Sequence, residues 1–563
     1  MPDTPASWWT DAVVYQLYVR SFCDANGDGR GDLAGIRARL GYLADLGVDA
    51  IWLNPCYPSP QYDHGYDVAD FFDIEPDYGD LATFDAIVAE ASALGLRVMM
   101  DIVPNHCSWE HPLFEAALVA APGSPERERF WFRDGKGEHG DGPPNNWTSY
   151  FTGPAWSRVI DADGHPEQWY MHSFAPQQPD WNWTNAEVVD HYDRALRFWL
   201  DRGAAGFRVD APQPVGKATG LPDLADLPDD PTVFVPNPYR EFRPEGHAVW
   251  QHWREVLDAY EAEHPGRDLV MVAETYSHKR PDIVAEFVGP NQHHQAFAFE
   301  LMLSRWNRTA LRDGIDSVVQ SRIGKLSTLA WTMNNHDVQR SVTRLGRSDA
   351  HLDPDDDVPQ SLNQSDAPVD LAVGAARAGA ALLLMLLLPG SSYIYQGEEL
   401  GLPEVLDLPA EAREDPMFHR SHGAVLGRDG CRVPLPWTVD AASSYGFSLT
   451  TAPAAPWLPQ PAAWGRYGAD AQVGDPASTF ALYQRVLRLR RKQRLAHGPF
   501  GWLDHPALLA YERGTTVVVT NPTGTTVALP AAWIDGRMLA ASSAVGDHDA
   551  SVVPADTTVW LTR

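Results

Sequence analysis

Eight short apolar segments separated by helical patterns constrain this 563-residue chain more than any other feature. They are rich in β-branched and aromatic residues, as buried strands are, and helical spacing recurs between them, for example over residues 33–46 and 190–201. Such alternation predicts an α/β fold, and eight strands predict a closed (β/α)8 TIM barrel. The segments with their flanking residues are 13–19, 50–55, 96–106, 205–211, 269–275, 295–300, 329–337 and 392–396.

Polar residues stand at the carboxyl ends of four of these segments. Arg208 and Asp210 lie two apart, so both side chains point to one face of their strand. The active site of a (β/α)8 barrel is built from such strand ends and the loops after them. Any one of these polar groups alone could be a structural ion pair or a cap. Four such groups, one after another along the chain, favour a catalytic site. The other groups are Asp101 with Asn105 and His106, Glu274, and His336 with Asp337.

Two stretches lie outside the barrel pattern. Between the strands at Arg97 and Gly206, residues rich in Trp, Pro, Gly and Asn predict a small domain inserted after strand 3, over the barrel mouth. Beyond a basic helix over residues 477–492, alternating apolar runs predict a C-terminal antiparallel β domain. We expect the barrel over residues 1–104 and 178–495, the inserted domain over 105–177, and a β-sandwich over 496–563.

Two irregular stretches carry weaker signals. The acidic residues 348–366 predict a solvated loop. Residues 443–464 are rich in Pro and Trp, and either wall the active site or form an ordinary loop.

Composition narrows the class of partner and the compartment. The formal net charge of −31 disfavours nucleic acid and anionic membranes by repulsion. The cysteines at 23, 56, 107 and 431 lack metal-like spacing and predict buried free thiols of a reducing cytosol. No signal peptide is evident, and the apolar run over residues 378–388 is too short to cross a bilayer. We therefore expect a cytoplasmic protein, as a monomer or a homodimer.

Several motifs together resemble a known family. Residues 101–106 (DIVPNH), 206–210 (GFRVD), Glu274 and residues 335–337 (NHD) resemble, in order and spacing, the four signature regions of the α-amylase superfamily, glycoside hydrolase family 13. Residues 178–183 (QPDWNW) resemble a further signature, in the form seen in oligo-1,6-glucosidases and α-glucosidases. Similar stretches are residues 24–32, 63–66, 396–401 (QGEELG) and 427–437 (GRDGCRVPLPW).

The resemblance implies roles for the catalytic carboxylates. Asp210 would be the nucleophile, Glu274 the general acid/base, and Asp337 the stabiliser of the transition state. The physical requirements agree, because retaining cleavage of an acetal needs one ionised and one protonated carboxyl group about 5 to 5.5 Å apart. We expect Arg208 to keep Asp210 charged, and burial near other carboxylates to raise the pKa of Glu274.

The resemblance also implies the residues that bind the sugar. His106 and His336 would hydrogen-bond hydroxyl groups of the glucose ring, beside Arg208. Tyr66 would stack on the ring, while Asp63 with Arg432 would grip the non-reducing-end hydroxyl group. A site closed in this way predicts an exo-acting enzyme.

A short loop before the first barrel helix predicts a metal site. Asp24, Asn26, Asp28 and Asp32 place side-chain oxygens at alternate positions with glycines between them, a pattern that suits a hard cation. It resembles the calcium loop of oligo-1,6-glucosidase-like enzymes, which implies that the carbonyl oxygen of Arg30 completes it. Structural Ca²⁺ is expected, Mg²⁺ is the second choice, and a turn without an ion stays open. No organic cofactor is expected.

Two departures from the family pattern concern linkage and acceptor. Ala211 follows the nucleophile where α-1,6-preferring members have Val, which favours α-1,4 linkages. Residues 212–217 (PQPVGK) are unlike the corresponding segment of close α-glucosidases, and we expect them to line the aglycone side.

Three hypotheses for function follow. The first is a retaining exo-α-glucosidase acting on short α-glucosides of the maltose type, with some transglucosylation. The second is a glucosyltransferase or isomerase of the same superfamily, similar to amylosucrase or trehalose synthase. The third is a non-catalytic member, like the ectodomain subunits of amino-acid transporters. Those subunits carry a membrane helix and lack part of the triad, whereas this chain has all three carboxylates and no such helix, which disfavours the third.

Overall fold

The protein is built around a closed barrel of eight parallel strands. The computed structural model describes residues 7–161, 163–225, 227, 235–276, 280–348, 367–451, 453–534, 537–543 and 551–563. Around the barrel the strand order is β1-β2-β3-β7-β8-β9-β10-β11, so all eight predicted strands and the TIM barrel are confirmed. The strands are β1 Val13–Leu17, β2 Ala50–Leu53, β3 Arg97–Ile102, β7 Gly206–Val209, β8 Val270–Ala273, β9 Gln295–Ala298, β10 Leu329–Thr332 and β11 Ser391–Tyr395.

Alternate residues of each strand face the interior of the barrel or the surrounding helices. Trp52, Met99 and Phe297 belong to the cluster inside the barrel, whereas Ile51 and Val98 belong to the larger core beneath the helices. Both sides are buried, which explains why the strands read as continuous apolar runs rather than alternating ones.

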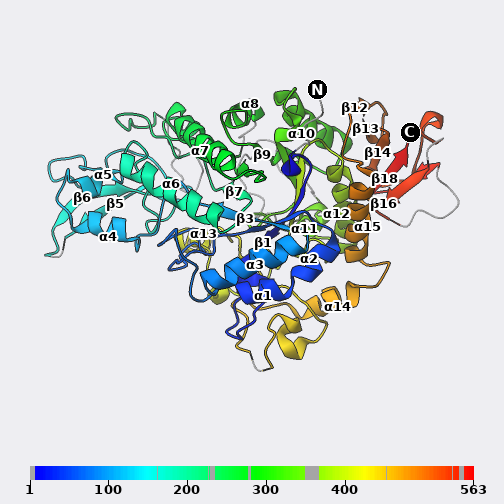
Figure 1. The fold of residues 1–563 in the computed structure, drawn as a ribbon, viewed down its shortest axis with the longest axis horizontal. Coiled ribbons are helices and arrows are strands. Elements are labelled where there is room, and N and C mark those ends of the chain that lie inside the picture. The colour runs from blue at the N-terminus through cyan, green and yellow to red at the C-terminus, as the bar shows by residue number, and fades with distance from the viewer. Residues whose placement is uncertain are drawn as a thin grey trace.

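Helices cover the outside of the barrel (Figure 1). In α6, Asn185 caps the amino end by accepting from the backbone N–H of Glu187, and the apolar residues that follow at helical spacing are buried. The barrel helices are α1 Leu33–Ala38, α2 Leu40–Leu46, α3 Leu81–Ala93, α6 Ala186–Asp201, α7 Pro244–Glu263, α8 Pro281–Val284, α9 Glu300–Leu303, α10 Arg308–Ser321, α11 Ser341–Gly346, α12 Leu371–Leu386, α13 Pro416–Arg420, α14 Ala469–Gln472 and α15 Thr479–Gln493.

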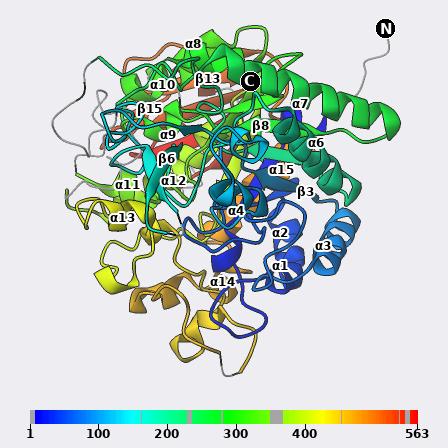
Figure 2. The same ribbon diagram turned by 90° about the vertical axis from the view of Figure 1, so that its left-hand side faces the viewer.

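An inserted segment and a C-terminal sheet lie at opposite ends of the molecule in Figure 1, and Figure 2 looks from the side of the inserted segment. Between β3 and α6 lie α4 Pro112–Val119, α5 Pro125–Glu128 and an antiparallel sheet of β4 Phe132–Arg133, β6 Pro166–Met171 and β5 Trp156–Ile160. This confirms the insertion after strand 3, while the three domain boundaries stay predictions.

The C-terminal region is an antiparallel β structure, as predicted. A five-stranded sheet pairs β12 Phe500–Leu503, β13 Leu509–Arg513, β14 Thr516–Asn521, β18 Thr557–Thr562 and β16 Met538–Ala541. A two-stranded sheet pairs β15 Val527–Ala528 with β17 Val552–Val553, and α16 Ala531–Ile534 lies between β15 and β16 in the chain. The sheet is fixed to the barrel through α12, for example by a hydrogen bond from the Trp560 indole to the carbonyl oxygen of Leu383.

Three further stretches singled out in the sequence can be compared with the structure. The helical pattern over residues 33–46 forms two helices, α1 and α2, because the backbone departs from helical geometry at Arg39. The acidic stretch 348–366 lies outside the described residues except for Ser348. In the stretch 443–464, Trp457 packs against the guanidinium group of Arg20 and the ring of His64, so this part supports the loops behind the site described below.

Candidate active site

The predicted catalytic residues meet at the carboxyl ends of the barrel strands. Arg208 is in β7, Asp210 follows that strand, Glu274 follows β8, and Asp337 comes five residues after β10. The side chains of Asp210, Glu274 and Asp337 are 11%, 10% and 17% exposed, so each is mostly buried but reaches solvent. Barrel geometry thus brings together the groups that the sequence places far apart.

One guanidinium group organises the first half of the site. Nη1 of Arg208 lies 2.7 Å from Oδ1 of Asp210 and 2.9 Å from Oδ1 of Asp101, while Nη2 lies 2.7 Å from Oε2 of Glu274. Asp210 and Glu274 are therefore held on the two terminal nitrogens of one planar group, which fixes their separation and mutual orientation. Glu274 also accepts a hydrogen bond of 3.2 Å from the backbone N–H of Ala211.

Two arginines organise the other half. Oδ1 of Asp337 lies 3.1 Å from Nη1 of Arg428 and 3.0 Å from Nη2 of Arg432, and its Oδ2 lies 3.4 Å from Nε2 of His336. Gln16 donates to Nδ1 of His336 over 2.7 Å, which leaves the ring proton on Nε2, facing Asp337.

The two halves give their carboxyl groups different proton affinities. Burial raises the pKa of Glu274 to about 8, helped by the charges of Asp210 and Asp337 and opposed by Arg208. Burial likewise raises the pKa of Asp210 to about 7, although Arg208 lowers it. The upward shift of Glu274 was expected. For Asp210 we expected Arg208 to keep the carboxyl group charged; Arg208 does lower its pKa, but it is shared with two further carboxylates.

Asp337 behaves in the opposite way. Burial opposes its ionisation, but the His336 ring, Arg428 and Arg432 outweigh burial and lower its pKa. Of the three predicted catalytic carboxyl groups, Glu274 therefore holds its proton to the highest pH and Asp337 to the lowest.

The predicted sugar-binding residues lie around these carboxylates. The ring of Tyr66 stacks on His336 with centroids 5.3 Å apart, and its hydroxyl group donates to Asp101 over 3.1 Å. Nε2 of His106 lies 3.1 Å from the side-chain nitrogen of Gln178, which donates to Asp63 over 3.0 Å. The site thus contains all the residues that the sequence assigned to the sugar.

The ion-pair partner of Asp63 is an arginine that the sequence did not single out. The expectation that Asp63 and Arg432 together grip the non-reducing-end hydroxyl group stays a prediction, and the ion pair of Asp63, 2.8 Å long, is with Arg428. Arg432 instead binds Asp337 and donates from Nε to the carbonyl oxygen of His336 over 2.8 Å. Asp415 accepts from both the backbone and the side chain of Arg428, and this directs Arg428 toward Asp63.

Sequence reasoning also missed two supporting residues. Gln178 links Asp63 to His106, as described above. Lys217 is buried, and its amine lies 2.8 Å from Asp180 and 2.8 Å from the amide oxygen of Asn105. Lys217, the last residue of the segment 212–217, binds the loop after β3 to the end of the inserted segment, and the expectation that the segment lines the aglycone side stays a prediction. The motifs containing Gln178 and Asn105 were visible signals, but their partners were not.

The segment after the nucleophile has an unusual backbone. Ala211 adopts φ +35°, a left-handed conformation that residues other than glycine seldom adopt. In this conformation its N–H points at Glu274. Ala211 therefore sits beside both catalytic carboxylates, as the linkage argument requires.

The acidic loop of residues 24–32 is turned by its own side chains. Both oxygens of Asp24 accept backbone N–H groups, from Gly27 over 2.6 Å and Gly29 over 3.1 Å, and these glycines have φ +89°. Asn26 and Asp28 accept from the residue two positions on, and Asp32 accepts from Ala25, Asn26 and Gly35. The carbonyl oxygen of Arg30 lies in the same loop. The oxygen chemistry fits Ca²⁺, and the geometry also fits the alternative of a turn without an ion.

A second acidic group lies elsewhere. Asp161, Asp163 and His165, in the turn between β5 and β6, bring three potential ligand atoms within 4.8 Å of one another. Asp163 and His165 are exposed. Asp161 already accepts the backbone N–H groups of Asp163 and His165, which accounts for the turn without an ion.

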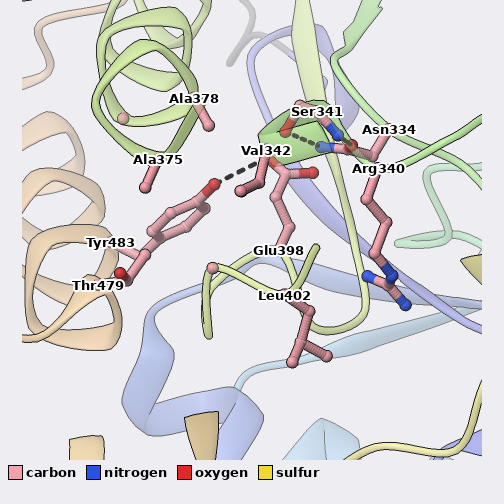
Figure 3. A pocket seen from close by; sticks show the side chains of 12 residues that line it. Asn334, Arg340, Ser341, Val342, Ala375, Ala378, Glu398, Leu402, Thr479 and Tyr483 are labelled. Atoms are coloured by element: carbon pink, nitrogen blue, oxygen red, sulfur yellow. Dashed lines mark hydrogen bonds between the residues drawn. The ribbon is translucent and has the colours of Figure 1, made fainter. Parts of the chain in front are cut away.

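A small cavity of about 20 Å³ is lined by side chains that support the loop carrying Asp337 (Figure 3). Glu398, from the 396–401 motif, accepts a hydrogen bond of 2.9 Å from Tyr483 of α15. Asn334 donates to the hydroxyl group of Ser341 over 3.1 Å and so closes the loop over residues 334–341, which contains Asp337. Burial raises the pKa of Glu398 to about 7. The motif is thus part of the scaffold behind the site.

Two general expectations can also be checked. All four cysteines are buried and free, as predicted. Among the described helices, none combines the length and the apolarity needed to span a membrane.

Comparison with known proteins decides the family. Residues 16–498 match the model of the α-amylase catalytic domain. The chain belongs to the α-amylase family. It is 36% identical over 513 residues to a probable α-glucosidase of Rhizobium meliloti, covering 88% of this chain and 85% of that protein. It is 34% identical over 553 residues to an oligo-1,6-glucosidase of Halalkalibacterium halodurans, covering 91% and 90%.

Solved structures of this family agree over the whole length. An α-glucosyl transfer enzyme, XgtA, is 32% identical with a TM-score of 0.83, covering 99% of this chain and all of that one. The trehalulose synthase MutB of Pseudomonas mesoacidophila is 28% identical with a TM-score of 0.81 and the same coverage. This member of the α-amylase family is therefore an α-glucosidase-like enzyme.

Proposed function

We propose that the protein is a retaining, exo-acting α-glucosidase that hydrolyses short α-glucosides, with α-1,4 linkages preferred. The observation that carries the proposal is the shared guanidinium group of Arg208, which holds Asp210 and Glu274 side by side. Retaining cleavage needs two carboxyl groups close together, one to attack the anomeric carbon and one to protonate the glycosidic oxygen.

The two roles follow from proton affinity. Glu274, with the higher pKa, donates its proton to the glycosidic oxygen while Asp210 attacks the anomeric carbon, giving a covalent β-glucosyl-enzyme. The Glu274 carboxylate then removes a proton from water, which attacks the same carbon and releases glucose. Asp337, ionised by its arginines, faces the positive charge that develops on the sugar ring.

The Asp63–Arg428 ion pair supports exo action. Both side chains are at least nine-tenths buried, and Arg428 also pairs with Asp337, so this wall is tied directly to the catalytic carboxylates. In the proposed enzyme it meets the terminal glucose unit, and the chain of a longer substrate leaves only on the other side.

A glucosyltransferase or isomerase is the second candidate. The similarity to an α-glucosyl transfer enzyme and a trehalulose synthase over nearly the full chain supports it. The hydrolase and the transferase or isomerase share the covalent intermediate. They differ in whether water or a sugar hydroxyl group attacks it.

Product analysis tests these proposals. We expect incubation with maltose, isomaltose, sucrose and trehalose, followed by chromatography, to yield glucose fastest from maltose. Oligosaccharides should appear at high maltose concentration. A rearranged disaccharide as the main product of sucrose would favour the isomerase, and no attack on any of the four would overturn the glucosidase.

We also propose that the loop of residues 24–32 binds structural Ca²⁺. The side-chain oxygens of Asp24, Asn26, Asp28 and Asp32, with the carbonyl oxygen of Arg30, would hold it. Removing the metal with a chelator should lower the melting temperature far more than it lowers kcat at moderate temperature. Asp28→Ala is the matched variant, since Asp28 is exposed and serves no other element. Equal melting temperatures with and without millimolar Ca²⁺ would exclude the site.

A further inference from the structure

The side-chain amide of Gln16 lies between the two halves of the active site. Gln16 is a buried residue of β1. Its amide nitrogen lies 2.7 Å from Nδ1 of His336 and 2.9 Å from Oδ1 of Asn54. Asn54, directly after β2, continues the chain of hydrogen bonds by donating from Nδ2 to the hydroxyl group of Tyr66 over 2.6 Å. The amide is therefore connected to two side chains that the sequence assigned to the sugar, directly to His336 and through Asn54 to Tyr66.

Each end of this chain of hydrogen bonds meets a carboxyl group. The hydroxyl group of Tyr66 lies 3.1 Å from Oδ2 of Asp101, and Nε2 of His336 lies 3.4 Å from Oδ2 of Asp337. Asp101 accepts from an indole N–H and a guanidinium group, and Asp337 accepts from two guanidinium groups. Because these groups only donate, both carboxyl groups act as acceptors. Each end of the chain is therefore satisfied only if it presents a proton.

One orientation of the Gln16 amide presents a proton at both ends. With its nitrogen between His336 and Asn54, the amide donates one N–H to each of them. His336 then accepts at Nδ1 and carries its proton on Nε2, facing one carboxyl group. Asn54 donates to Tyr66, whose hydroxyl proton faces the other. Burial lowers the pKa of His336 and raises that of Tyr66, so the imidazole carries a single proton and the phenol keeps its own.

The opposite orientation of the amide fails at both ends. With Oε1 of Gln16 in the place of the nitrogen, Nδ1 of His336 would have to donate, and its bare Nε2 would face Asp337. Asn54 would have to donate to Gln16, and Tyr66 would then donate to Asn54 and turn a lone pair toward the other carboxyl group. Each end would place one buried acceptor against another, which is unfavourable.

We propose that Gln16 is a positioning residue that orders the hydrogen bonds of both sugar-binding rings through its two N–H groups. One N–H sets the tautomer of His336, and the other, through Asn54, sets the direction of the Tyr66 hydroxyl group. A primary amide carries two N–H groups on one atom, which two chains running in opposite directions require. Gln16 thereby couples the two halves of the active site.

Neutron crystallography of the deuterated protein tests the proposal directly, because it locates the protons that X-ray structures of ordinary resolution do not show. We expect deuterium on Nε2 of His336 and none on Nδ1, and two deuterium atoms on the amide nitrogen of Gln16. The Tyr66 deuterium should be directed at Asp101. Deuterium on Nδ1 of His336, or a Tyr66 deuterium directed at Asn54, would overturn the proposal.

The effect on sugar binding rests on the proposed function and needs a separate test. Gln16→Glu keeps the shape of the side chain but replaces the donors by acceptors, which reverses both chains. Gln16→Met removes the donors without reversing either chain. We expect the inhibition constant of glucose to rise about three- to tenfold in Gln16→Met and about a hundredfold in Gln16→Glu. Equal inhibition constants in the two variants would mean that Gln16 only fills space.

Gln295→Glu is the matched control. Gln295 is buried at the start of β9, at the opposite end of the barrel, and its amide nitrogen donates to the carbonyl oxygens of Trp9 and Ser327. This variant also buries a new carboxyl group, so it should melt at a lower temperature and keep the inhibition constant of glucose. A rise like that of Gln16→Glu would overturn the positioning role, because instability alone would then weaken sugar binding. If the wild type does not bind glucose, the proposed function fails, while the neutron structure still decides the hydrogen bonds.

Discussion

The two halves of the active site contain the same kinds of side chain in different proportions. In the acidic half, one guanidinium group, Arg208, serves Asp101, Asp210 and Glu274. In the basic half, Arg428 and Arg432 both serve Asp337, with His336 beside it. A shared cation leaves carboxyl groups able to hold protons near neutral pH, whereas two cations on one carboxylate keep it ionised.

The two halves of the site therefore suit different chemical roles. Groups that must gain or lose a proton, or form a bond, belong in the acidic half, and a group that must stay charged belongs in the basic half. Asp101 shows that composition alone is insufficient. It shares Arg208 and its pKa is raised to about 7, but it accepts from Tyr66 and the Trp52 indole and is fully buried. It supports Arg208 and does not meet the substrate.

The largest expected effect comes from removing the reacting carboxyl groups of the acidic half. Asp210→Asn and Glu274→Gln should each lower kcat/KM for maltose by about two to four orders of magnitude or more. An aryl glucoside with a good leaving group needs no proton, so it should restore much of the rate to Glu274→Gln and none to Asp210→Asn. Steady-state kinetics with both substrates checks this. Equal restoration in both variants would mean that the roles are assigned wrongly.

The next effect separates the two arginines of the basic half. Arg428→Ala removes the ion-pair partner of Asp63 and Asp415 and one of the two arginines on Asp337, so KM for maltose should rise about a hundredfold. Arg428→Lys keeps the charge without the planar fork, so its KM for maltose should lie between those of the wild type and of Arg428→Ala. Arg432→Ala leaves Asp63 paired and should affect KM less and kcat more, through Asp337. A larger KM effect at Arg432 than at Arg428 would favour the sequence prediction that Arg432, with Asp63, grips the non-reducing-end hydroxyl group.

The halves should also differ in how pH changes stability. The folded pKa of Glu274, about 8, lies above its ordinary value, so its contribution to stability is full at low pH and is lost as pH rises toward 8. Asp337 has a lowered pKa, so its contribution is present above the ordinary pKa and is lost only in acid.

Calorimetry from about pH 5 to about pH 9 checks this difference. The melting temperature of Glu274→Gln relative to wild type should rise by on the order of a few degrees over that range. The deficit of Asp337→Asn should stay constant. Parallel curves for all three proteins would show that the halves do not differ in charge balance.

The sequence predicted the parts of this site that depend on local order. Eight buried strands appear as apolar runs, and residues just beyond a strand end must meet at one end of a barrel, which gave Arg208, Asp210, Glu274 and Asp337. The partner of Asp63 could not be found in this way. Arg428 and Arg432 are four residues apart in one motif, and the choice depends on how Asp415 bends the loop between α13 and that motif.

Long-range partners of buried polar groups were equally hidden. Lys217 binds Asn105 across 112 positions of the chain, and nothing in its surrounding sequence marks it as buried.

The smallest effect concerns Ala211, which lies at the edge of the acidic half and donates to Glu274. Ala211→Val adds bulk beside the scissile bond, and two methyl groups at a substrate wall are worth about 1 to 3 kcal/mol. The kcat/KM ratio of maltose to isomaltose should therefore fall by roughly ten- to two-hundredfold.

Backbone strain must be separated from bulk in this experiment. Valine is disfavoured at φ +35°, so the variant should also melt at a lower temperature and lose rate on both substrates. Strain disturbs Glu274 equally for either linkage, so only the ratio reports bulk. Ala211→Gly is the control, since it relieves the strain and removes bulk, and it should melt higher without lowering the ratio. A wild type that already prefers isomaltose, or a valine variant with an unchanged ratio, would move linkage choice away from Ala211 to other groups on the aglycone side.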